Sequence, residues 1–375
     1  MAIPTLPTFV NGQAPALDAT NMNAIADAAK DAHARLDAAS VTGLTDISRA
    51  PGVDPTGVTE CASAVRDALA TVAAGAGTAY AKGTFKIGSR VTIASNANMV
   101  DALFNYTQGT GIGVVIGTEV SDQTVEKKLI YAPRVRCSAK TLPNWSQVPT
   151  NVGIQVINVA SSNLWIPEVM GFSVGLEFYG RGTGNVHNTT TLGHIYNNQR
   201  NQLLLADATG WTNQNLFLGG RFGHDSNHGV QAAGTRQIEL GVTSNAINNN
   251  TWIGASLEGT TSEYNVAVAG YWNEFHNCRW ETTGGARVLW RNPSDENLIR
   301  GGYGARNIVQ TYEPGAGSAN MIEAAQRSRR TGQGSPNGVV AAFPGTLYTN
   351  LNGGAGQTLW VKESGLNTNT GWVAK

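Results

Sequence analysis

The feature that most constrains this chain is a repeat of about 25 residues in its second half. Each unit begins with Asn or Thr, and the starts are Asn163, Thr189, Asn215, Asn250, Asn273 and Asn297. Successive starts are separated by 26, 26, 35, 23 and 24 residues. A period of this length predicts a stack of similar units, because one such unit is too small to bury its apolar face alone.

Aligned columns of the repeat predict which side chains face the interior. Two positions after each start, the column reads Trp165, Thr191, Phe217, Trp252, Phe275 and Ile299. Alternate residues of a strand share one face, so we expect this column to point inward and to pack on its equivalents in neighbouring coils. A second strand is predicted in most repeats, at 203–205, 238–240, 266–268, 288–290 and 308–309. The alternative is an irregular all-β sandwich in which the columns match by accident.

Polar and flexible residues of the repeat predict its corners and its internal hydrogen bonds. Four positions after each start stand Pro167, Gly193, Gly219, Gly254, Asn277 and Gly301. Gly and Asn tolerate the positive φ that a corner requires. The Asn residues at the starts are expected to hydrogen-bond to their equivalents in the coils above and below. The pattern therefore predicts a parallel β-helix.

A helix with its own boundary signals precedes the repeats. Residues 52–57 have turn chemistry, and Thr59 is the predicted N-cap, with Glu60 in the first turn. One face of the helix carries Ala62, Val65, Leu69 and Val72, and Gly75-Ala-Gly77 ends it. Strands are predicted at 78–81, 84–87 and 90–93. We expect the helix to cover one end of the stack, whose edges would otherwise be open.

These segments resemble a known superfamily. The turn GVDPTG at 52–57 and the strand pair AGTAYAKGTFKI at 76–87 are similar to the opening of the pectate-lyase-like right-handed parallel β-helices found in phage tailspikes. The resemblance implies an all-β fold, with a short N-terminal helix and a small C-terminal β module. It implies no activity, because one fold hosts many functions. The hydrolase motifs NTD, DD, GHG and RIK of polygalacturonase-like β-helices are not intact here.

Both ends of the chain resemble phage tail proteins. The C-terminal block contains GSPNGVV, PGTLY, GGAGQTLWVKESG and TGWVAK, as in a small module of many phage tail fibres. The segment FVNGQAPAL at 9–17, followed by NMN at 21–23, is similar to the opening of phage tail proteins. The resemblance implies a bacteriophage tail fibre or tailspike in the virion tail. It divides the chain into a virion-attachment segment (1–48), a β-helix shaft (49–312), a linker (313–333) and a C-terminal module (334–375).

Two features predict a homotrimer. Met22, Ile25, Ala29, Ala32 and Leu36 follow heptad-like spacings in a helix expected at 20–38. This stripe suits either copies that meet on an axis or a helix that lies on another tail or baseplate protein. The C-terminal module is too short for a sizeable core, so copies meeting on a threefold axis would complete it.

Composition excludes several classes of protein. Lys and Arg total 26, as do Asp and Glu, so there is no basic surplus for nucleic acid. The sequence has no apolar stretch of about 18 residues, so we do not predict membrane insertion. The first residues lack the pattern of a signal peptide. The cysteines at 61, 137 and 278 form no CxxC pair, so we predict neither a metal nor a cofactor.

Candidate catalytic residues lie eight positions after two of the starts. Glu258 and Glu281 are expected on the outer face of adjacent coils, about 4.8 Å apart at the backbone. Paired glycosidase carboxyls are about 5–5.5 Å apart in retaining enzymes and about 6.5–9.5 Å apart in inverting ones, so a catalytic pair is one interpretation. The alternative is two solvated glutamates beside an arginine.

Candidate glycan-binding residues lie in the same region. Arg221, Ser256 and Arg279 form an outward column six positions after their starts, and Trp272 lies outside the inward columns. The 35-residue spacing indicates an insertion at 223–235, which we expect to form a lip beside the glycan, with His224 and Asp225 as further candidate glycan-binding residues. His224, Asp225 and His228 could also be read as a metal cluster, and the alternative is a polar loop. Two hypotheses result: a virion protein that attaches to a host surface polysaccharide, and a depolymerase that cleaves it.

Overall fold

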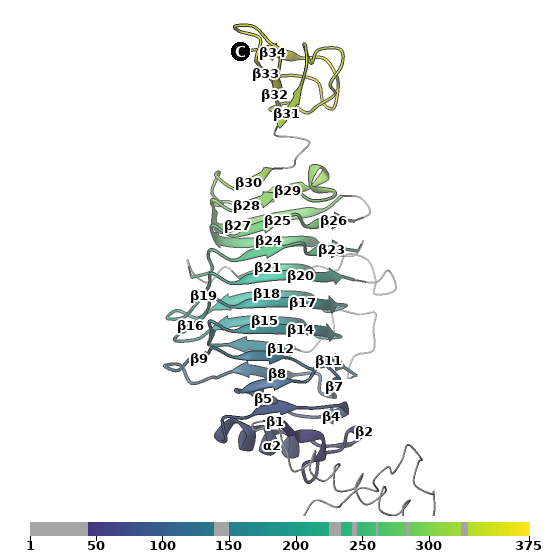
Figure 1. The fold of residues 1–375 in the computed structure, drawn as a ribbon, viewed down its shortest axis with the longest axis vertical. Coiled ribbons are helices and arrows are strands. Elements are labelled where there is room, and N and C mark those ends of the chain that lie inside the picture. Colours follow the sequence, from purple (N-terminus) through teal and green to yellow (C-terminus); the bar gives the residue numbers. More distant parts are fainter. Residues whose placement is uncertain are drawn as a thin grey trace, which may run out of the picture.

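The computed structural model describes residues 44–138, 150–224, 234–241, 246–259, 262–282, 285–323 and 329–375. Over these residues the chain forms a right-handed parallel β-helix, followed by a small separate sheet (Figure 1). The predicted fold class is therefore confirmed. The helix expected at 20–38 and most of the predicted attachment segment lie outside the described residues.

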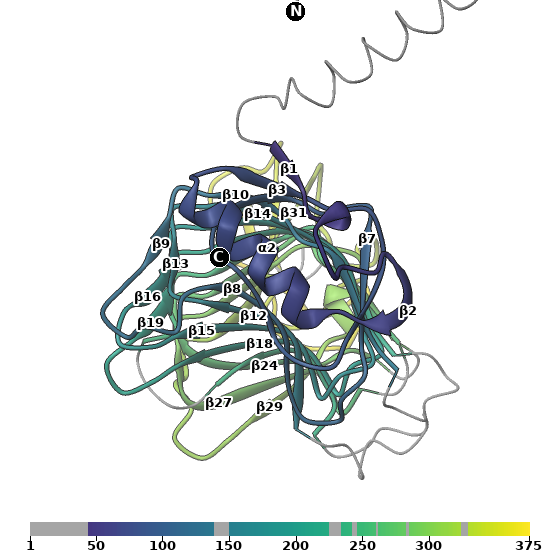
Figure 2. The ribbon, with the colours of Figure 1, turned by 90° about the horizontal axis from the view of Figure 1, so that it is seen from below.

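The β-helix winds through three parallel sheets, which enclose one interior (Figure 2). Within the described residues the first sheet contains β1 (Leu44–Asp46), β2 (Thr56–Glu60), β3 (Thr78–Tyr80), β4 (Gly83–Ile87), β6 (Asn96–Asn98), β7 (Ala102–Tyr106), β10 (Leu129–Tyr131), β11 (Arg134–Cys137), β14 (Asn163–Met170), β17 (Thr189–Tyr196), β20 (Leu216–Gly223), β22 (Thr251–Ile253), β23 (Ser256–Glu258), β25 (Glu274–His276), β26 (Arg279–Glu281), β28 (Leu298–Arg300) and β30 (Met321–Glu323).

The second and third sheets complete each coil. The second contains β5 (Val91–Ile93), β8 (Gly111–Gly117), β12 (Asn151–Ile157), β15 (Val174–Gly180), β18 (Arg200–Ala206), β21 (Arg236–Leu240), β24 (Tyr264–Tyr271), β27 (Arg287–Asp295) and β29 (Val309–Tyr312). The third contains β9 (Val125–Glu126), β13 (Val159–Ala160), β16 (Gly184–Val186) and β19 (Trp211–Asn213). The predicted second strands fall in β18, β21, β24, β27 and β29, although Ile308 itself lies just before β29.

The first sheet is divided along its length into two halves. β10 pairs with the start of β14 and β11 with its end, and the same division separates β22 from β23 and β25 from β26. The turn between the halves contains Gly219 (φ 67°), Gly254 (φ 70°), Asn277 (φ 50°) and Gly301 (φ 66°). These four predicted corners are confirmed, whereas Pro167 and Gly193 have no left-handed φ.

The predicted register of the repeat is wrong by one residue in its first two units. Thr189 pairs with Leu216 rather than with Asn215, so Ser162 and Asn188 occupy the positions assigned to Asn163 and Thr189. Leu164 and Thr190 therefore face the interior, while Trp165 and Thr191 face outward. Trp165 is 36% exposed. A shift of one residue reverses the face of every side chain in a strand.

The expected bonds between stacked asparagines are confirmed in the corrected register. An asparagine ladder consists of Asn188, Asn215, Asn250, Asn273, Asn297 and Asn320, all buried. The Nδ2 of each of the first five donates to the Oδ1 of the next asparagine at 2.8–3.1 Å. Each of these Oδ1 atoms also accepts the backbone N–H of the preceding asparagine. The ladder satisfies polar groups that would otherwise be unpaired in the interior.

Apolar side chains fill the space between the sheets in one continuous core. The rings of Phe217, Trp252 and Phe275 stack in successive coils, with centroids 4.8 and 4.6 Å apart. Phe178 meets Phe217 edge to face at 5.0 Å. The inward positions of Phe217, Trp252, Phe275 and Ile299 are thus confirmed.

Helix α2 (Ala62–Ala74) covers one end of the stack (Figure 2). It buries Ala62, Val65, Leu69 and Val72, as predicted. The predicted cap is wrong, because the helix begins after Cys61 and has no side-chain cap. Thr59 and Glu60 belong to β2, and the Glu60 carboxylate accepts the backbone N–H groups of Ala62 and Gly88 at 3.0 and 2.9 Å.

Both ends of the shaft differ from the predicted boundaries. β1 pairs with β3 ahead of residue 49, and a 3-10 helix (Ile47–Arg49) follows it. At the other end, after a 3-10 helix at Ala305–Asn307, β30 pairs with β28 inside the predicted linker. β31 (Arg329–Gly332) already belongs to the last sheet, so the linker is shorter than predicted.

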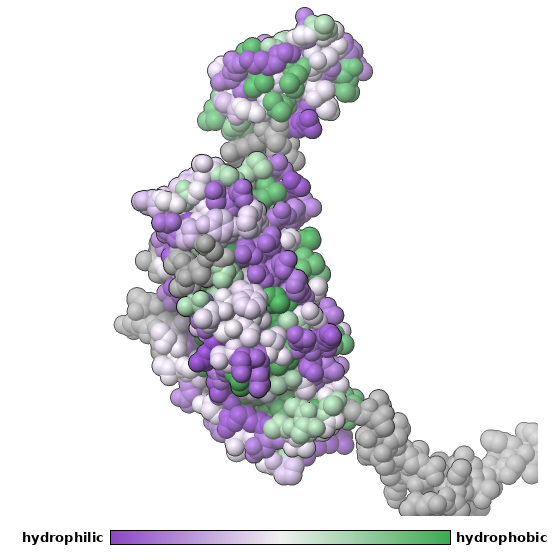
Figure 3. Space-filling model, turned by 90° about the vertical axis from the view of Figure 1, so that its left-hand side faces the viewer, coloured by the Kyte–Doolittle hydropathy of each residue, from purple (hydrophilic) through white to green (hydrophobic). Residues whose placement is uncertain are grey.

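The C-terminal module is a small four-stranded sheet formed by β31, β32 (Leu347–Asn350), β33 (Leu359–Lys362) and β34 (Trp372–Ala374). Its apolar core consists of Ala342, Tyr348 and Trp372. Other apolar side chains of the module lie on its surface, including Val339, Leu351 and Leu366. Hydrophobic residues are visible on the surface of the module in Figure 3.

Candidate functional site: the outer face of the first sheet

The predicted site residues of the shaft form two adjacent columns on the second half of the first sheet. Arg221 pairs with Ser256 and Ser256 with Arg279, while Glu258 pairs directly with Glu281. Glu258 directly follows the buried Leu257, and Glu281 directly follows the buried Trp280. Because neighbouring residues of a strand point to opposite faces, the two glutamate side chains face outward. The stacking of these residues on adjacent coils agrees with the sequence-based expectation.

Each glutamate in these columns is paired with an arginine. Arg221 Nε donates to Glu258 Oε2 at 2.8 Å, and Ser256 Oγ donates to Glu258 Oε1 at 2.6 Å. Arg279 forms an ion pair with Glu281. Closer to the N-terminal end, Arg136 pairs with Glu168 on the same half of the sheet. We call these six charged residues, Arg136, Glu168, Arg221, Glu258, Arg279 and Glu281, the arginine–glutamate strip.

The surroundings of Glu258 favour its ionised form. Burial raises the pKa of Glu258, but the hydrogen bonds from Ser256 and Arg221 outweigh burial, so the pKa lies below its ordinary value. A general acid for glycoside hydrolysis requires the opposite shift. Glu258 therefore has the character of an ion-pair partner. As one of a catalytic pair it is limited to the role of base or nucleophile.

The remaining predicted residues are not gathered at this strip. Trp272 is 50% exposed at a corner (φ 56°), and β25 separates it from Arg279 along the chain. The prediction that His224 faces a glycan is wrong, because its ring is 2% exposed. Its Nδ1 lies 2.9 Å from Ser262 Oγ, and its Nε2 lies 2.5 Å from the backbone oxygen of Asn198. Asp225 and His228 lie outside the described residues.

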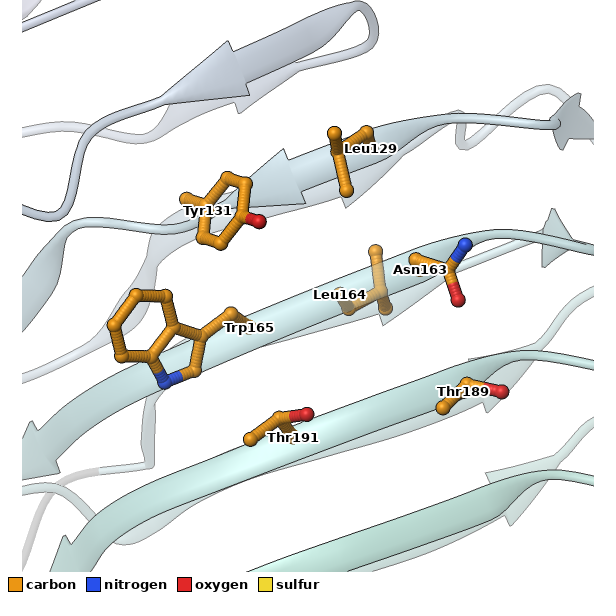
Figure 4. Close-up of a pocket in the computed structure, with 7 residues that line it drawn as sticks. All are labelled: Leu129, Tyr131, Asn163, Leu164, Trp165, Thr189 and Thr191. Atoms are coloured by element: carbon orange, nitrogen blue, oxygen red, sulfur yellow. The ribbon is translucent and has the colours of Figure 1, made fainter.

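A shallow depression on the first half of the same sheet was missed by the sequence reasoning. It has a volume of about 290 Å³ and is lined by Leu129, Tyr131, Asn163, Leu164, Trp165, Thr189 and Thr191. Tyr131 and Trp165 meet edge to face, with ring centroids 5.3 Å apart. The indole of Trp165 lies between Tyr131 and Thr191 of the neighbouring strands (Figure 4). We call this the aromatic depression.

The aromatic depression was missed because the one-residue register error assigned Trp165 to the interior. A usable signal was present in the sequence. Leu164 and Ile166 flank Trp165, and both are apolar and buried, so strict alternation of the strand requires Trp165 to face outward. The Asn at 188, rather than the Thr at 189, marks the matching start.

Two other classes of site were searched for in the described part of the chain. No three His, Cys, Asp or Glu side chains there gather closely enough to hold a metal ion. No helix among the described residues is long and apolar enough to cross a membrane.

Comparisons with known proteins add solved structures of low similarity. No family model and no curated protein matches the sequence. ORF18 of Geobacillus virus E2 aligns with 91% of this chain and 68% of its own, at 14% identity and a TM-score of 0.46. The Dettilon tailspike protein aligns over 77% and 69%, at 12% identity and a TM-score of 0.38. PfbA, a surface adhesin of Streptococcus pneumoniae, aligns over 88% and 98%, at 11% identity and a TM-score of 0.40. At these values, the likenesses do not indicate what this chain binds.

Proposed function

We propose that this chain is a bacteriophage tail fibre or tailspike protein that attaches the virion to a glycan on the host cell surface. The observation that carries the proposal is the aromatic depression on a flat outer sheet. Partly exposed rings that contact each other, with hydroxyl and amide groups beside them, suit the apolar faces and hydroxyl edges of sugars. The resemblance of both chain ends to phage tail proteins supports a place in the virion tail.

The proposed assembly is a homotrimer whose N-terminal 48 residues bind other tail or baseplate proteins. The small core of the C-terminal module and its exposed apolar side chains favour contacts with further copies. Three copies would also turn weak glycan contacts into avidity. Sedimentation equilibrium should give about three times the chain mass of 39.4 kDa, and a monomer at micromolar concentration would contradict the trimer.

The attachment function is tested with purified full-length protein. Labelled protein is incubated with strains of the host bacterium, and free surface polysaccharide from the same strain is added as competitor. We expect binding that the polysaccharide abolishes. Binding that survives both the competitor and periodate oxidation of the cell-surface sugars would contradict a glycan receptor.

Cleavage of the same glycan is the alternative function, and the direct pairing of Glu258 with Glu281 is the observation that favours it. One carboxyl would protonate the glycosidic oxygen, and the other carboxylate would attack the sugar or activate water. New reducing ends after incubation with the polysaccharide, lost in Glu258→Gln or Glu281→Gln without loss of cell binding, would establish it. We favour attachment, because the arginine partners hold these carboxylates in ion pairs.

A further inference from the structure

The first sheet presents a surface of uncharged side chains on five successive coils. The outward positions of β10, β14, β17, β20 and β22 are in register through their strand pairs. None of the ten is an Asp, Glu, Lys, Arg or His. We call this surface the uncharged panel, and its members are Leu129, Tyr131, Asn163, Trp165, Thr189, Thr191, Leu216, Leu218, Thr251 and Ile253.

Charged side chains border the uncharged panel on the second half of the sheet and in the coils that follow it. The arginine–glutamate strip lies beside the panel, on the second half of the same sheet. In the coils that follow, Glu274, His276, Arg300 and Glu323 occupy the equivalent outward positions, and Arg300 Nε donates to Glu323 Oε2 at 2.9 Å. On the N-terminal side the equivalent outward positions in β6 and β3 are also uncharged, and they are Asn96, Asn98, Thr78 and Tyr80. The aromatic depression therefore lies within an uncharged surface that ends at β25.

The aromatic depression offers two kinds of contact. The indole face of Trp165 is partly exposed, and its edge-to-face contact with Tyr131 restricts the ring. Asn163 supplies an amide, and Thr189 and Thr191 supply hydroxyls, which both donate and accept hydrogen bonds. A volume of about 290 Å³ is at the small end of ligand pockets, so the depression holds a short part of a larger ligand.

We propose that the aromatic depression binds an uncharged saccharide unit of a polymeric glycan, stacked on Trp165. The proposal deepens the attachment function and rests on it. An acidic sugar would lose hydration without gaining a cation, because the lining contains neither Lys nor Arg. The arginine–glutamate strip does not supply the missing cation, because Arg136, Arg221 and Arg279 are already paired with glutamates.

The test measures binding of the full-length protein to immobilised bacterial polysaccharides, some uncharged and some acidic, and to cells of the strains that produce them. We expect binding to uncharged polysaccharide, with less than a twofold change in affinity between 50 and 500 mM NaCl, since no ion pair contributes. Trp165→Ala should weaken it at least tenfold. Trp165→Tyr should restore most of it, because a ring remains.

Matched controls separate the depression from the rest of the surface. Trp272→Ala removes a more exposed indole outside the depression and should leave affinity unchanged, as should Arg279→Ala. Thr191→Val keeps the shape and removes one hydroxyl, and we expect a threefold to tenfold loss. Circular dichroism and the thermal midpoint should match the parent protein for each variant.

Three results would overturn this inference. The first is binding that is restricted to acidic polysaccharides and weakened by salt, or binding that is undiminished in Trp165→Ala. Either outcome would place the glycan site elsewhere on the protein and would leave the attachment proposal intact. A change of sedimentation mass in Trp165→Ala, without loss of glycan binding, would show that the panel faces another copy of the chain. Loss of cell binding after protease treatment but not after periodate treatment would indicate a protein receptor and would overturn the attachment proposal as well.

Discussion

The shaft and the C-terminal module bury their side chains in different ways. The shaft has one apolar core that continues from coil to coil, with α2 over its first end. The module buries Ala342, Tyr348 and Trp372, together with the side chain of a lysine, Lys362. Lys362 Nζ donates to the backbone oxygen of Gly365 at 2.9 Å and to Thr368 Oγ1 at 3.1 Å, and it also contacts the carbonyls of Ser364 and Thr370.

The difference shows what repetition contributes. Each shaft coil covers its neighbours, so a coil of about 25 residues gains a core that it would lack alone. The module has no repeating neighbour, and hydrogen bonds to one ammonium group hold its last loop in place of apolar packing. This contrast predicts how each part responds to the loss of a single side chain.

The largest expected effect is in the shaft, from Trp252→Ala. The indole stacks between Phe217 and Phe275, and its Nε1 donates to the buried Gln202 Oε1 at 2.9 Å. Removal should lower the free energy of unfolding by about 3–5 kcal/mol. Denaturant unfolding followed by fluorescence measures it, with the exposed Trp272→Ala as control, expected within about 0.5 kcal/mol of the parent. Equal losses in the two variants would contradict a continuous core.

Lys362→Met should affect the module and leave the shaft unchanged. The change leaves buried carbonyls without their donor, and a loss of about 3 kcal/mol of local stability is expected, because hydrogen bonds from a charged group are the strong ones. Hydrogen exchange of residues 334–375 in the full chain reports it. Lys375→Met is the control, since its ammonium pairs with Glu363 at the surface. Faster exchange in the shaft would show that the two parts unfold together.

Asn273→Ala tests the asparagine ladder within the shaft. The substitution removes the bond to Asn297 and the acceptor used by Asn250, so buried amide and N–H groups lose their partners. We expect a loss of about 2 kcal/mol, below that of Trp252→Ala. The thermal midpoint measures it. Asn277→Gly changes an exposed asparagine at a left-handed corner and should be nearly neutral, so comparable losses would mean that the ladder is not the cause.

The smallest effects are pH-dependent and differ in sign between two glutamates of the shaft. Burial raises the pKa of Glu177, which outweighs the hydrogen bond from Gln155 Nε2 at 2.5 Å. A raised carboxyl pKa in the folded state lowers stability as pH rises above the unfolded value of about 4.3. Glu177→Gln should therefore stabilise the shaft at pH 8 and have little effect at pH 4.

Glu258 should behave in the opposite way. Its lowered pKa contributes stability above the unfolded value, and this contribution is lost as pH falls through the folded pKa. Glu258→Gln should cost less than about 1 kcal/mol at pH 7 and nothing near pH 2, because the group is partly exposed. Thermal midpoints across this pH range measure both variants. The same pH trend in both would contradict the assigned causes.

The sequence predicts the fold of this chain better than its site, for a physical reason. The buried face of α2 and the inward ring column from Phe217 to Phe275 follow from apolar periodicity, which packing enforces. The face of Thr191 depends on the register of its strand, which the pairing of Thr189 with Leu216 fixes. The alternation of Leu164, Trp165 and Ile166 does indicate the outward face of Trp165, but the alignment on Asn163 placed it one residue out of register. The burial of His224 depends on Ser262 and the Asn198 carbonyl, which come from other coils. Contacts between coils join residues that are far apart in the sequence, so a single stretch of sequence does not predict them, whereas it does predict periodicity.

The asparagine ladder has a mechanical consequence. Its hydrogen bonds run along the shaft axis, parallel to the backbone hydrogen bonds between coils. A force applied to the two ends of the shaft therefore acts on all the coil–coil interfaces in series, and the weakest interface ruptures first. The ladder ends at Ser162, where the next coil is joined by the Lys128 N–H donating to Ser162 Oγ at 3.0 Å rather than by a paired amide. Single-molecule stretching between residues 44 and 323 should therefore rupture the shaft first on the N-terminal side of Ser162. A first rupture among the coils from Asn188 to Asn320 would show that the amides add no tensile strength.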